Sequence, residues 1–291
     1  MDHMSSQIQK IAVPFKAILA RRAIQIPLQV VLISTAVALA IISLPDSHAP
    51  IDTAAFNWAE IFGGLSFYVI FYLVFAVHWA YALSIIENKK IHFGQILAFF
   101  SSQPYKYFPT SIFSFSARSV YSRKAGAESL VATAKAQLVE YGSIFASGLI
   151  VIALAKAGVS AITLIASGLV ACTYLLYEKL YVNRKRGRVY KYLILVLIST
   201  IGWLIAGISF YFVVQGVGDV VSYKQSLFIN TAAYLASIAA IFVPAGIGIR
   251  EAILFSQNVG FVGTLSWRIC SIVIDIVSGI VAIISINKKT K

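Results

Sequence analysis

The chain has 291 residues, of which 59% are hydrophobic and only 12% are charged. Soluble domains are typically about 45–50% apolar and about 25% charged, so the composition excludes a soluble enzyme, a disordered chain and a disulfide scaffold. The 24 Lys and Arg residues outnumber the 11 Asp and Glu residues and give a net charge of +13. Because these basic residues lie between apolar runs, they indicate a multi-spanning membrane protein beside anionic lipid, and no nucleic-acid partner.

Six apolar stretches are long enough to cross a membrane, which takes about 20 residues of helix. They are roughly 24–44, 61–86, 129–153, 158–178, 192–214 and 267–286. Two further apolar regions are interrupted: residues 95–116 contain Pro104 and Pro109, and residues 226–262 contain the run VPAGIGIRE. We expect each interrupted region to enter the membrane and return to the same side as a re-entrant hairpin.

The basic residues predict the orientation. Most of the 24 Lys and Arg residues fall on one side of the membrane if both interrupted regions return to the side they entered from. The positive-inside rule then places both termini in the cytoplasm and the chain in the cytoplasmic (inner) membrane. We therefore expect a cytoplasmic segment at 1–23, a single transmembrane domain at 24–286 and a cytoplasmic tail at 287–291.

The predicted elements form two units of opposite orientation, at about 61–153 and 192–286. Each unit has a span, a hairpin and a second span, and the hairpins enter from opposite sides. The spacing within the units agrees, because Pro109 precedes Glu140 by 31 residues and Pro244 precedes Asp275 by 31 residues. The expected fold is an all-α polytopic membrane protein with about six full helices, two re-entrant hairpins and an inverted repeat, as in many transporters.

The second hairpin contains a candidate anion site. Pro244 lacks the N–H that a helix needs, while Gly246 and Gly248 permit turns, so we expect one helix to stop near Phe242 and another to start near Gly246. The second helix would direct free N–H groups at a ligand, and Arg250 about one turn in would add a guanidinium suited to phosphate or carboxylate.

The alternative is a structural kink in which Arg250 pairs with Glu251 or Asp275. Arg268 and Asp275 are seven residues apart on one face of a helix. With Arg250 and Glu251 they are expected to form a polar cluster, in which Asp275 could simply orient Arg268. Charges at membrane depth are costly and tend to serve a function, which favours the anion site.

The first hairpin gives a second candidate region. Glu140 is a lone carboxylate in the middle of a predicted span, and its partner is Arg118, Lys135 or Arg123. The basic residues that follow Pro109 are either a first contact for an anionic lipid head group or a collar of side chains that extend to the interface.

No catalytic group, metal ligand set or cofactor-binding motif is recognisable in the sequence. The four histidines are scattered, and no phosphate-binding loop or hydrolase motif is present. We therefore expect no cofactor, no metal and no enzymatic activity.

The run VPAGIGIREAILF, followed by a helix with an Arg and an Asp, resembles the lysylphosphatidylglycerol synthase transmembrane-region family, also called flippase-like domain proteins. That family typically has a Pro-Gly-Gly-x-Gly-x-Arg-Glu-Ala run, and here Ala245 takes the place of the first glycine. Pro109, Arg118 and Glu140 resemble an earlier Pro, Arg and mid-helix Glu of the family, although the glycines of its first motif are missing.

The resemblance implies a translocase that moves an anionic or large-headed lipid across the membrane by alternating access. Candidates are a modified phospholipid or a polyprenyl-phosphate-linked sugar, and a separate glycosyl- or aminoacyl-transferase is an expected partner. The chain ends five residues beyond its last predicted span, so we expect the translocating part without the soluble aminoacyltransferase domain of the full synthases. The alternative is a membrane-embedded lipid-modifying transferase or an accessory subunit of one. The residues expected at the head-group site are Pro109, Arg118, Glu140, Pro244, Gly246, Gly248, Arg250, Glu251, Arg268 and Asp275.

Overall fold

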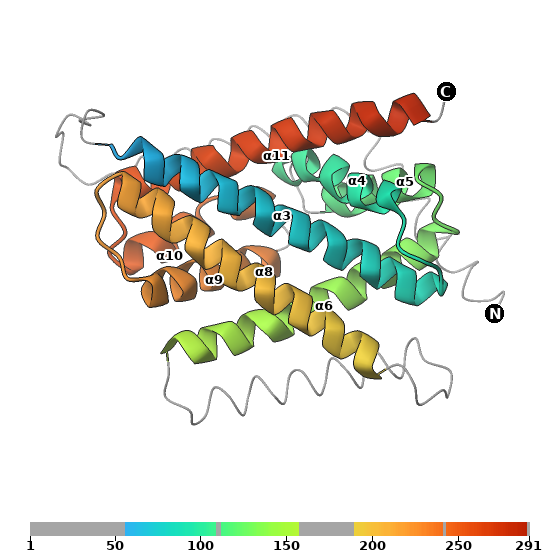
Figure 1. The fold of residues 1–291 in the computed structure, drawn as a ribbon, viewed down its shortest axis with the longest axis horizontal. Coiled ribbons are helices and arrows are strands. Elements are labelled where there is room, and N and C mark those ends of the chain that lie inside the picture. Colours follow the sequence, from blue (N-terminus) through green and yellow to red (C-terminus); the bar gives the residue numbers. More distant parts are fainter. Residues whose placement is uncertain (1–55, 109–111, 157–188, 241–242, 290–291) are drawn as a thin grey trace.

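The computed structural model describes residues 56–108, 112–156, 189–240 and 243–289. These residues form helices and no strands, which confirms the predicted all-α class. In chain order the helices are α3 (Trp58–Glu87), α4 (Phe93–Ser102), η2 (Gln103–Tyr107), α5 (Ile112–Lys124), α6 (Leu130–Lys156), α8 (Val189–Gly216), α9 (Tyr223–Ala239), η3 (Pro244–Gly246), α10 (Ile249–Ser256) and α11 (Phe261–Lys289) (Figure 1).

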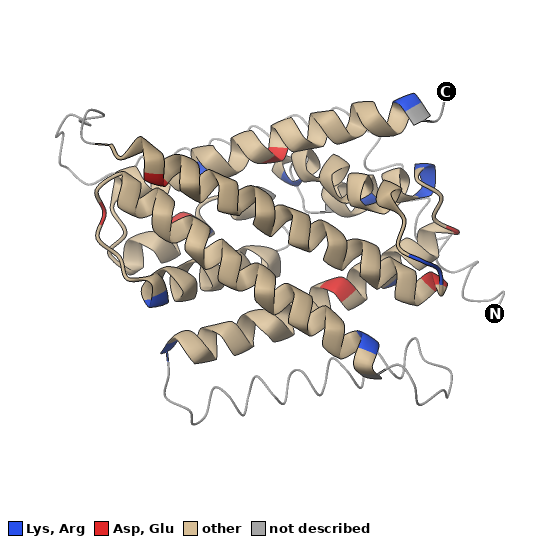
Figure 2. Ribbon diagram, viewed as in Figure 1, with Lys and Arg blue, Asp and Glu red and all other residues tan. Residues whose placement is uncertain are grey.

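Four of the helices, α3, α6, α8 and α11, are long and apolar enough to cross a membrane. With 27 to 30 residues each, they extend about 40–45 Å at 1.5 Å per residue, against a hydrocarbon core of about 30 Å. They coincide with four of the six predicted spans. The other two, at 24–44 and 158–178, lie outside the described residues. Figure 2 shows Lys, Arg, Asp and Glu mainly at the helix ends, as expected for a membrane-embedded protein.

The long helices run in two directions. α3 and α11 run one way along the molecule, and α6 and α8 run the other way (Figure 1). α3 packs along α8, and their close approach depends on Gly64, whose carbonyl accepts a hydrogen bond of 2.7 Å from Ser209 Oγ. A Cβ atom on Gly64 would lie 2.9 Å from the Ser209 carbonyl oxygen and 3.0 Å from the Val213 backbone nitrogen. Small residues at a helix interface allow this spacing in membranes.

The glycine pair in α3 provides a matched test of this interface. Gly64→Ala should lower the free energy of unfolding by about 1–3 kcal/mol, because backbone atoms of α8 cannot yield to the new methyl group. Gly63→Ala meets nothing within 4 Å and should be neutral or stabilising, by up to about 1 kcal/mol of helix propensity. Unfolding of the two variants in mixed micelles measures this difference. Equal stability of the two would contradict the packing described.

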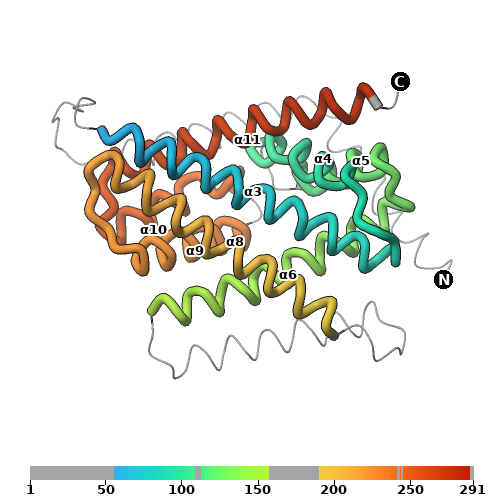
Figure 3. Tube along the Cα trace, viewed as in Figure 1, coloured from blue at the N-terminus to red at the C-terminus, as the bar shows by residue number. Residues whose placement is uncertain are grey.

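The remaining helices are short and form two groups at opposite ends of the molecule (Figures 1 and 3). α4 and α5 have 10 and 13 residues, and α9 and α10 have 17 and 8. Each is about 12–25 Å long, which is less than the thickness of the hydrocarbon core. α4 packs against α5 and α11, whereas α9 packs against α10, α6 and α8.

The break between α9 and α10 is wider than predicted. α9 ends at Ala239, the expected stop near Phe242 lies outside the described residues, and α10 begins at Ile249 instead of near Gly246. The later start has a backbone cause, because Ala245, Gly246 and Gly248 have φ of 49°, 66° and 85°. Residues in this left-handed region cannot continue a right-handed helix, so α10 starts only after Gly248.

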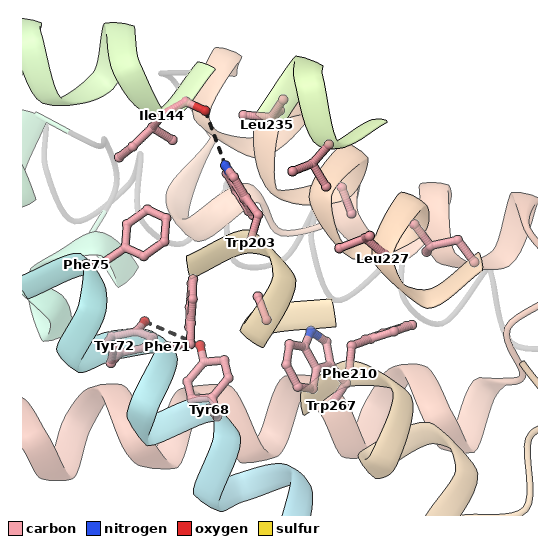
Figure 4. Close-up of a cluster of buried hydrophobic side chains, with 14 of the residues drawn as sticks. Tyr68, Phe71, Tyr72, Phe75, Ile144, Trp203, Phe210, Leu227, Leu235 and Trp267 are labelled. Carbon is pink, nitrogen blue, oxygen red and sulfur yellow. Dashed lines mark hydrogen bonds between the residues drawn. The ribbon is translucent and has the colours of Figure 1, made fainter. Parts of the chain in front are cut away.

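An aromatic core joins the long helices (Figure 4). Trp203 of α8 is fully buried, and its Nε1–H donates to the Ile144 carbonyl of α6 at 3.3 Å and to Ser147 Oγ at 3.1 Å. Phe75 of α3 meets the Trp203 ring edge-on at 5.7 Å, an arrangement that adds stability beyond area burial. This core holds together the long helices against which the short helices pack.

Candidate anion-binding site

A cavity of about 370 Å³ lies between the two groups of short helices. Side chains from α3, α4, α5, α6, α9 and α10 line it, and most of them are apolar or aromatic. The charged lining residues among those described are Lys106, Arg118, Glu140 and Arg250. Apolar walls with a few convergent polar groups are typical of ligand sites.

Arg118 of α5 is buried and paired with a carboxylate. Its Nη1 lies 2.6 Å from Glu140 Oε2 on α6, and its Nε–H donates to Ser102 Oγ of α4 at 3.1 Å. The guanidinium stacks over Phe99, 4.7 Å from the ring centroid, and lies 5.3 Å from the ring of Trp79. We call Arg118, Ser102 and Phe99 the Arg118 site.

Arg250 of α10 has a matching environment without the carboxylate. Its Nε–H donates to Ser237 Oγ at 3.0 Å, and its guanidinium lies 4.3 Å from the ring centroid of Tyr234. Gly246 allows this approach, because a Cβ there would fall 2.1 Å from Ser237 Cβ. No carboxylate of the described residues is within ion-pair distance of Arg250. We call Arg250, Ser237 and Tyr234 the Arg250 site.

The two sites correspond by position along the chain. Three residues of the second unit follow their counterparts in the first unit by 135 residues. The pairs are Phe99 and Tyr234, Ser102 and Ser237, and Glu140 and Asp275. The two arginines are 132 residues apart. In both units a ring and a serine three residues later lie on one helical turn and hold a guanidinium from the next helix. The sites differ in their charge balance, since Glu140 reaches Arg118 whereas Asp275 does not reach Arg250.

Asp275 is instead held by a separate group of donors. Its carboxylate accepts hydrogen bonds from the hydroxyls of Tyr72 and Tyr107 and pairs with Lys106 Nζ at 2.5 Å. The same Nζ donates to Tyr72 Oη at 2.7 Å. The idea that Asp275 orients Arg268 is therefore wrong, because seven residues of helix separate the two by about 10 Å along the axis.

Glu251 forms an ion pair and a capping hydrogen bond at the start of α10. Its Oε1 lies 2.6 Å from Arg268 Nε, and its Oε2 accepts the Gly248 N–H at 2.6 Å. This second bond caps α10, so the Gly248 amide that was expected to meet a ligand is already used. The alternative in which Arg250 pairs with Glu251 or Asp275 is also wrong, since both carboxylates have other partners.

The predicted residues separate into those that reach the cavity and those that support it. Arg118, Glu140, Gly246 and Arg250 line the cavity. Among the three possible partners of Glu140, the structure selects Arg118. The supporting residues are Gly248, Glu251, Arg268 and Asp275. Pro244 opens η3, and Pro109 lies outside the described residues.

Several side chains of the site were not predicted from the sequence. They are Tyr72, Phe99, Ser102, Lys106, Tyr107, Tyr234 and Ser237. The constant interval of 135 residues is a signal that would have found the rings and serines. Lys106 lies in the interrupted apolar region 95–116, and no sequence signal joins it to Asp275.

The charge balance leaves one positive charge near the cavity. The cations are Lys106, Arg118, Arg250 and Arg268, and the carboxylates are Glu140, Glu251 and Asp275. Three cations are matched by carboxylates, and the fourth, Arg250, is only 8% exposed. A buried charge is expensive unless it is paired, so Arg250 is suited to bind an anion from outside the described residues.

The chain matches no protein-family model, no curated protein and no solved structure.

Proposed function

We propose that the protein is a lipid translocase that holds the anionic head group of a membrane lipid at Arg250. The observation that carries the proposal is the buried guanidinium of Arg250, which faces the cavity with a hydroxyl and a ring but no carboxylate among the described residues. Guanidinium groups suit phosphate because they offer several donors in one plane. The lipid could be a modified phospholipid or a polyprenyl-phosphate-linked sugar, and a separate glycosyl- or aminoacyl-transferase could act beside the protein.

A lipid fits this cavity better than a small solute. Leu138 lines the cavity and yet has 61% of its surface exposed on α6, so the cavity reaches the outer face of a membrane-spanning helix. An opening of this kind lets a head group enter while its acyl chains stay in the bilayer. A solute carrier would need a cavity closed to lipid on its sides.

The proposal includes the inverted repeat, with about six full helices and two re-entrant hairpins. It is supported by the matching Arg118 and Arg250 sites and by the opposite placement of α4–α5 and α9–α10. The packing is also reciprocal, because α4 of the first unit lies against α11 of the second and α9 of the second lies against α6 of the first. Units of this type exchange conformations when they rock around a central site, which gives alternating access.

In the proposed orientation the protein lies in the cytoplasmic membrane, and its α4–α5 end is on the cytoplasmic side. It is supported by Lys89, Lys90, Arg123, Lys124 and Lys191, which lie in the loops and helix ends at that side. Both termini would then be cytoplasmic. Membership of the flippase-like family, which the motif around Arg250 suggests, is part of the same proposal.

Vesicles test the function directly. The purified chain is reconstituted into phosphatidylcholine vesicles with a trace of fluorescent phosphatidylglycerol, and dithionite added outside destroys the accessible label. We expect the protein to raise the quenched fraction from about half towards all of the label, because the inner-leaflet lipid reaches the outside. A quenched fraction equal to that of protein-free vesicles contradicts translocation. A new lipid product in mass spectra, after incubation with activated donors, would instead favour the transferase alternative.

A further inference from the structure

The Arg118 and Arg250 sites offer the same three groups to the same cavity. Each presents a guanidinium, a serine hydroxyl that accepts from its Nε–H, and an aromatic ring under its plane. Both arginines and both serines line the cavity. The difference in charge is the Glu140 carboxylate, which lies 2.6 Å from Arg118 Nη1. A carboxylate and a phosphate oxygen bind a guanidinium in the same way.

We infer that the Arg118 site is a second binding site for the same anion, and that Glu140 occupies it in this conformation as a tethered substitute. The inference rests on the proposed function and deepens it. As the two units exchange conformations, Glu140 would leave Arg118, and the head group would pass from one arginine to the other without losing a partner.

The charge balance also indicates the chemical class of the head group. Lys106, Arg118, Arg250 and Arg268 face three carboxylates, which leaves one positive charge for the guest. A phosphodiester carries one negative charge, whereas a phosphomonoester carries about −1.5 to −2 at neutral pH. A singly charged phosphodiester therefore neutralises the cavity, and a monoester leaves excess negative charge in a poorly solvated space.

Native mass spectrometry of the full chain in detergent tests the inference by counting bound ligands. The probe is dihexanoylphosphatidylglycerol, a short-chain phosphodiester lipid. We expect one bound copy for the unmodified chain and none for Arg250→Ala. Glu140→Gln removes the competing charge and should bind two copies, while Glu140→Gln with Arg250→Ala should bind one. Glu140→Asp keeps the charge and should still bind one.

The counts separate this inference from the proposed function. Absence of binding to the unmodified chain overturns the anion site and with it the proposed function. One copy on both the unmodified chain and Glu140→Gln overturns only the second site. Dihexanoylphosphatidic acid, a monoester, should bind at least about tenfold more weakly, and equal binding overturns the assignment of the phosphodiester class.

Two further measurements complete the test. Glycerophosphoglycerol, which has the same head group without acyl chains, should bind at least about tenfold more weakly than the lipid, and equal binding overturns the lipid as the source of the phosphodiester. If Glu140→Gln is too unstable to purify, its melting temperature in membranes is measured with and without the short-chain lipid. We expect a larger rise than for the unmodified chain, because the phosphate refills the Arg118 site. An equal or smaller rise overturns the second site.

Discussion

Replacing Arg250 with alanine is expected to abolish lipid movement and leave the fold intact. Truncating one partner of a buried, charge-assisted contact costs about 2–5 kcal/mol, which corresponds to a loss of at least about 30-fold in affinity for the head group. The fold should not suffer, because no carboxylate of the described residues depends on Arg250. A buried charge without a partner is costly, so its removal offsets the contacts with Ser237 and Tyr234 that are lost. The vesicle assay and unfolding in mixed micelles measure the two effects.

Lys224→Ala is the matched control for this variant. It removes the same charge from the same group of short helices, but Lys224 is exposed near the start of α9 and does not line the cavity. We expect normal lipid movement. Normal movement by Arg250→Ala would remove Arg250 from the mechanism, and unfolding of Arg250→Ala would mean that its charge supports the structure.

Substitutions in the Arg118–Glu140 pair, unlike Arg250→Ala, are expected to destabilise the fold. Arg118→Ala and Glu140→Ala should each lower the free energy of unfolding by roughly 3–5 kcal/mol, because each leaves a buried charge without its partner. The double variant should lose less than the sum of the two, since no unpaired charge remains. Unfolding in mixed micelles, analysed as a double-mutant cycle, measures the coupling.

The exposed pair Lys89–Glu128 is the control for this cycle. Its side chains are 3.0 Å apart and each is 52% exposed, against 8% and 1% for Arg118 and Glu140. Lys89→Ala and Glu128→Ala should therefore change stability by less than about 1 kcal/mol each. Purely additive losses for Arg118 and Glu140 would show that their contact contributes nothing.

The long helices could be predicted from the sequence because hydrophobic length alone determines them. Each of the four long helices, α3, α6, α8 and α11, contains an 18-residue window of high mean hydropathy, and its limits differ from the predicted ones by one to six residues. The start of α10 could not be located, because it depends on the left-handed backbone of Ala245, Gly246 and Gly248. Composition permits such a conformation without requiring it.

The candidate site was predictable only in part, because its contacts depend on how separate helices pack. Arg118, Glu140 and Arg250 stood out because charges in apolar runs are rare, and all three line the cavity. The interval of 135 residues relates Ser102 to Ser237, but which arginine each serine contacts depends on how α4, α5, α9 and α10 pack. Periodicity within one helix favoured Arg268 as the partner of Asp275. The structure instead pairs Asp275 with Lys106, a residue far away in the sequence.

A cryo-electron microscopy structure in nanodiscs that contain phosphatidylglycerol tests the anion site most directly. We expect a lipid phosphate within hydrogen-bond distance of the Arg250 guanidinium, inside the cavity, with the acyl chains leaving past Leu138. An empty cavity with Arg250 paired to a carboxylate of the chain would contradict the account.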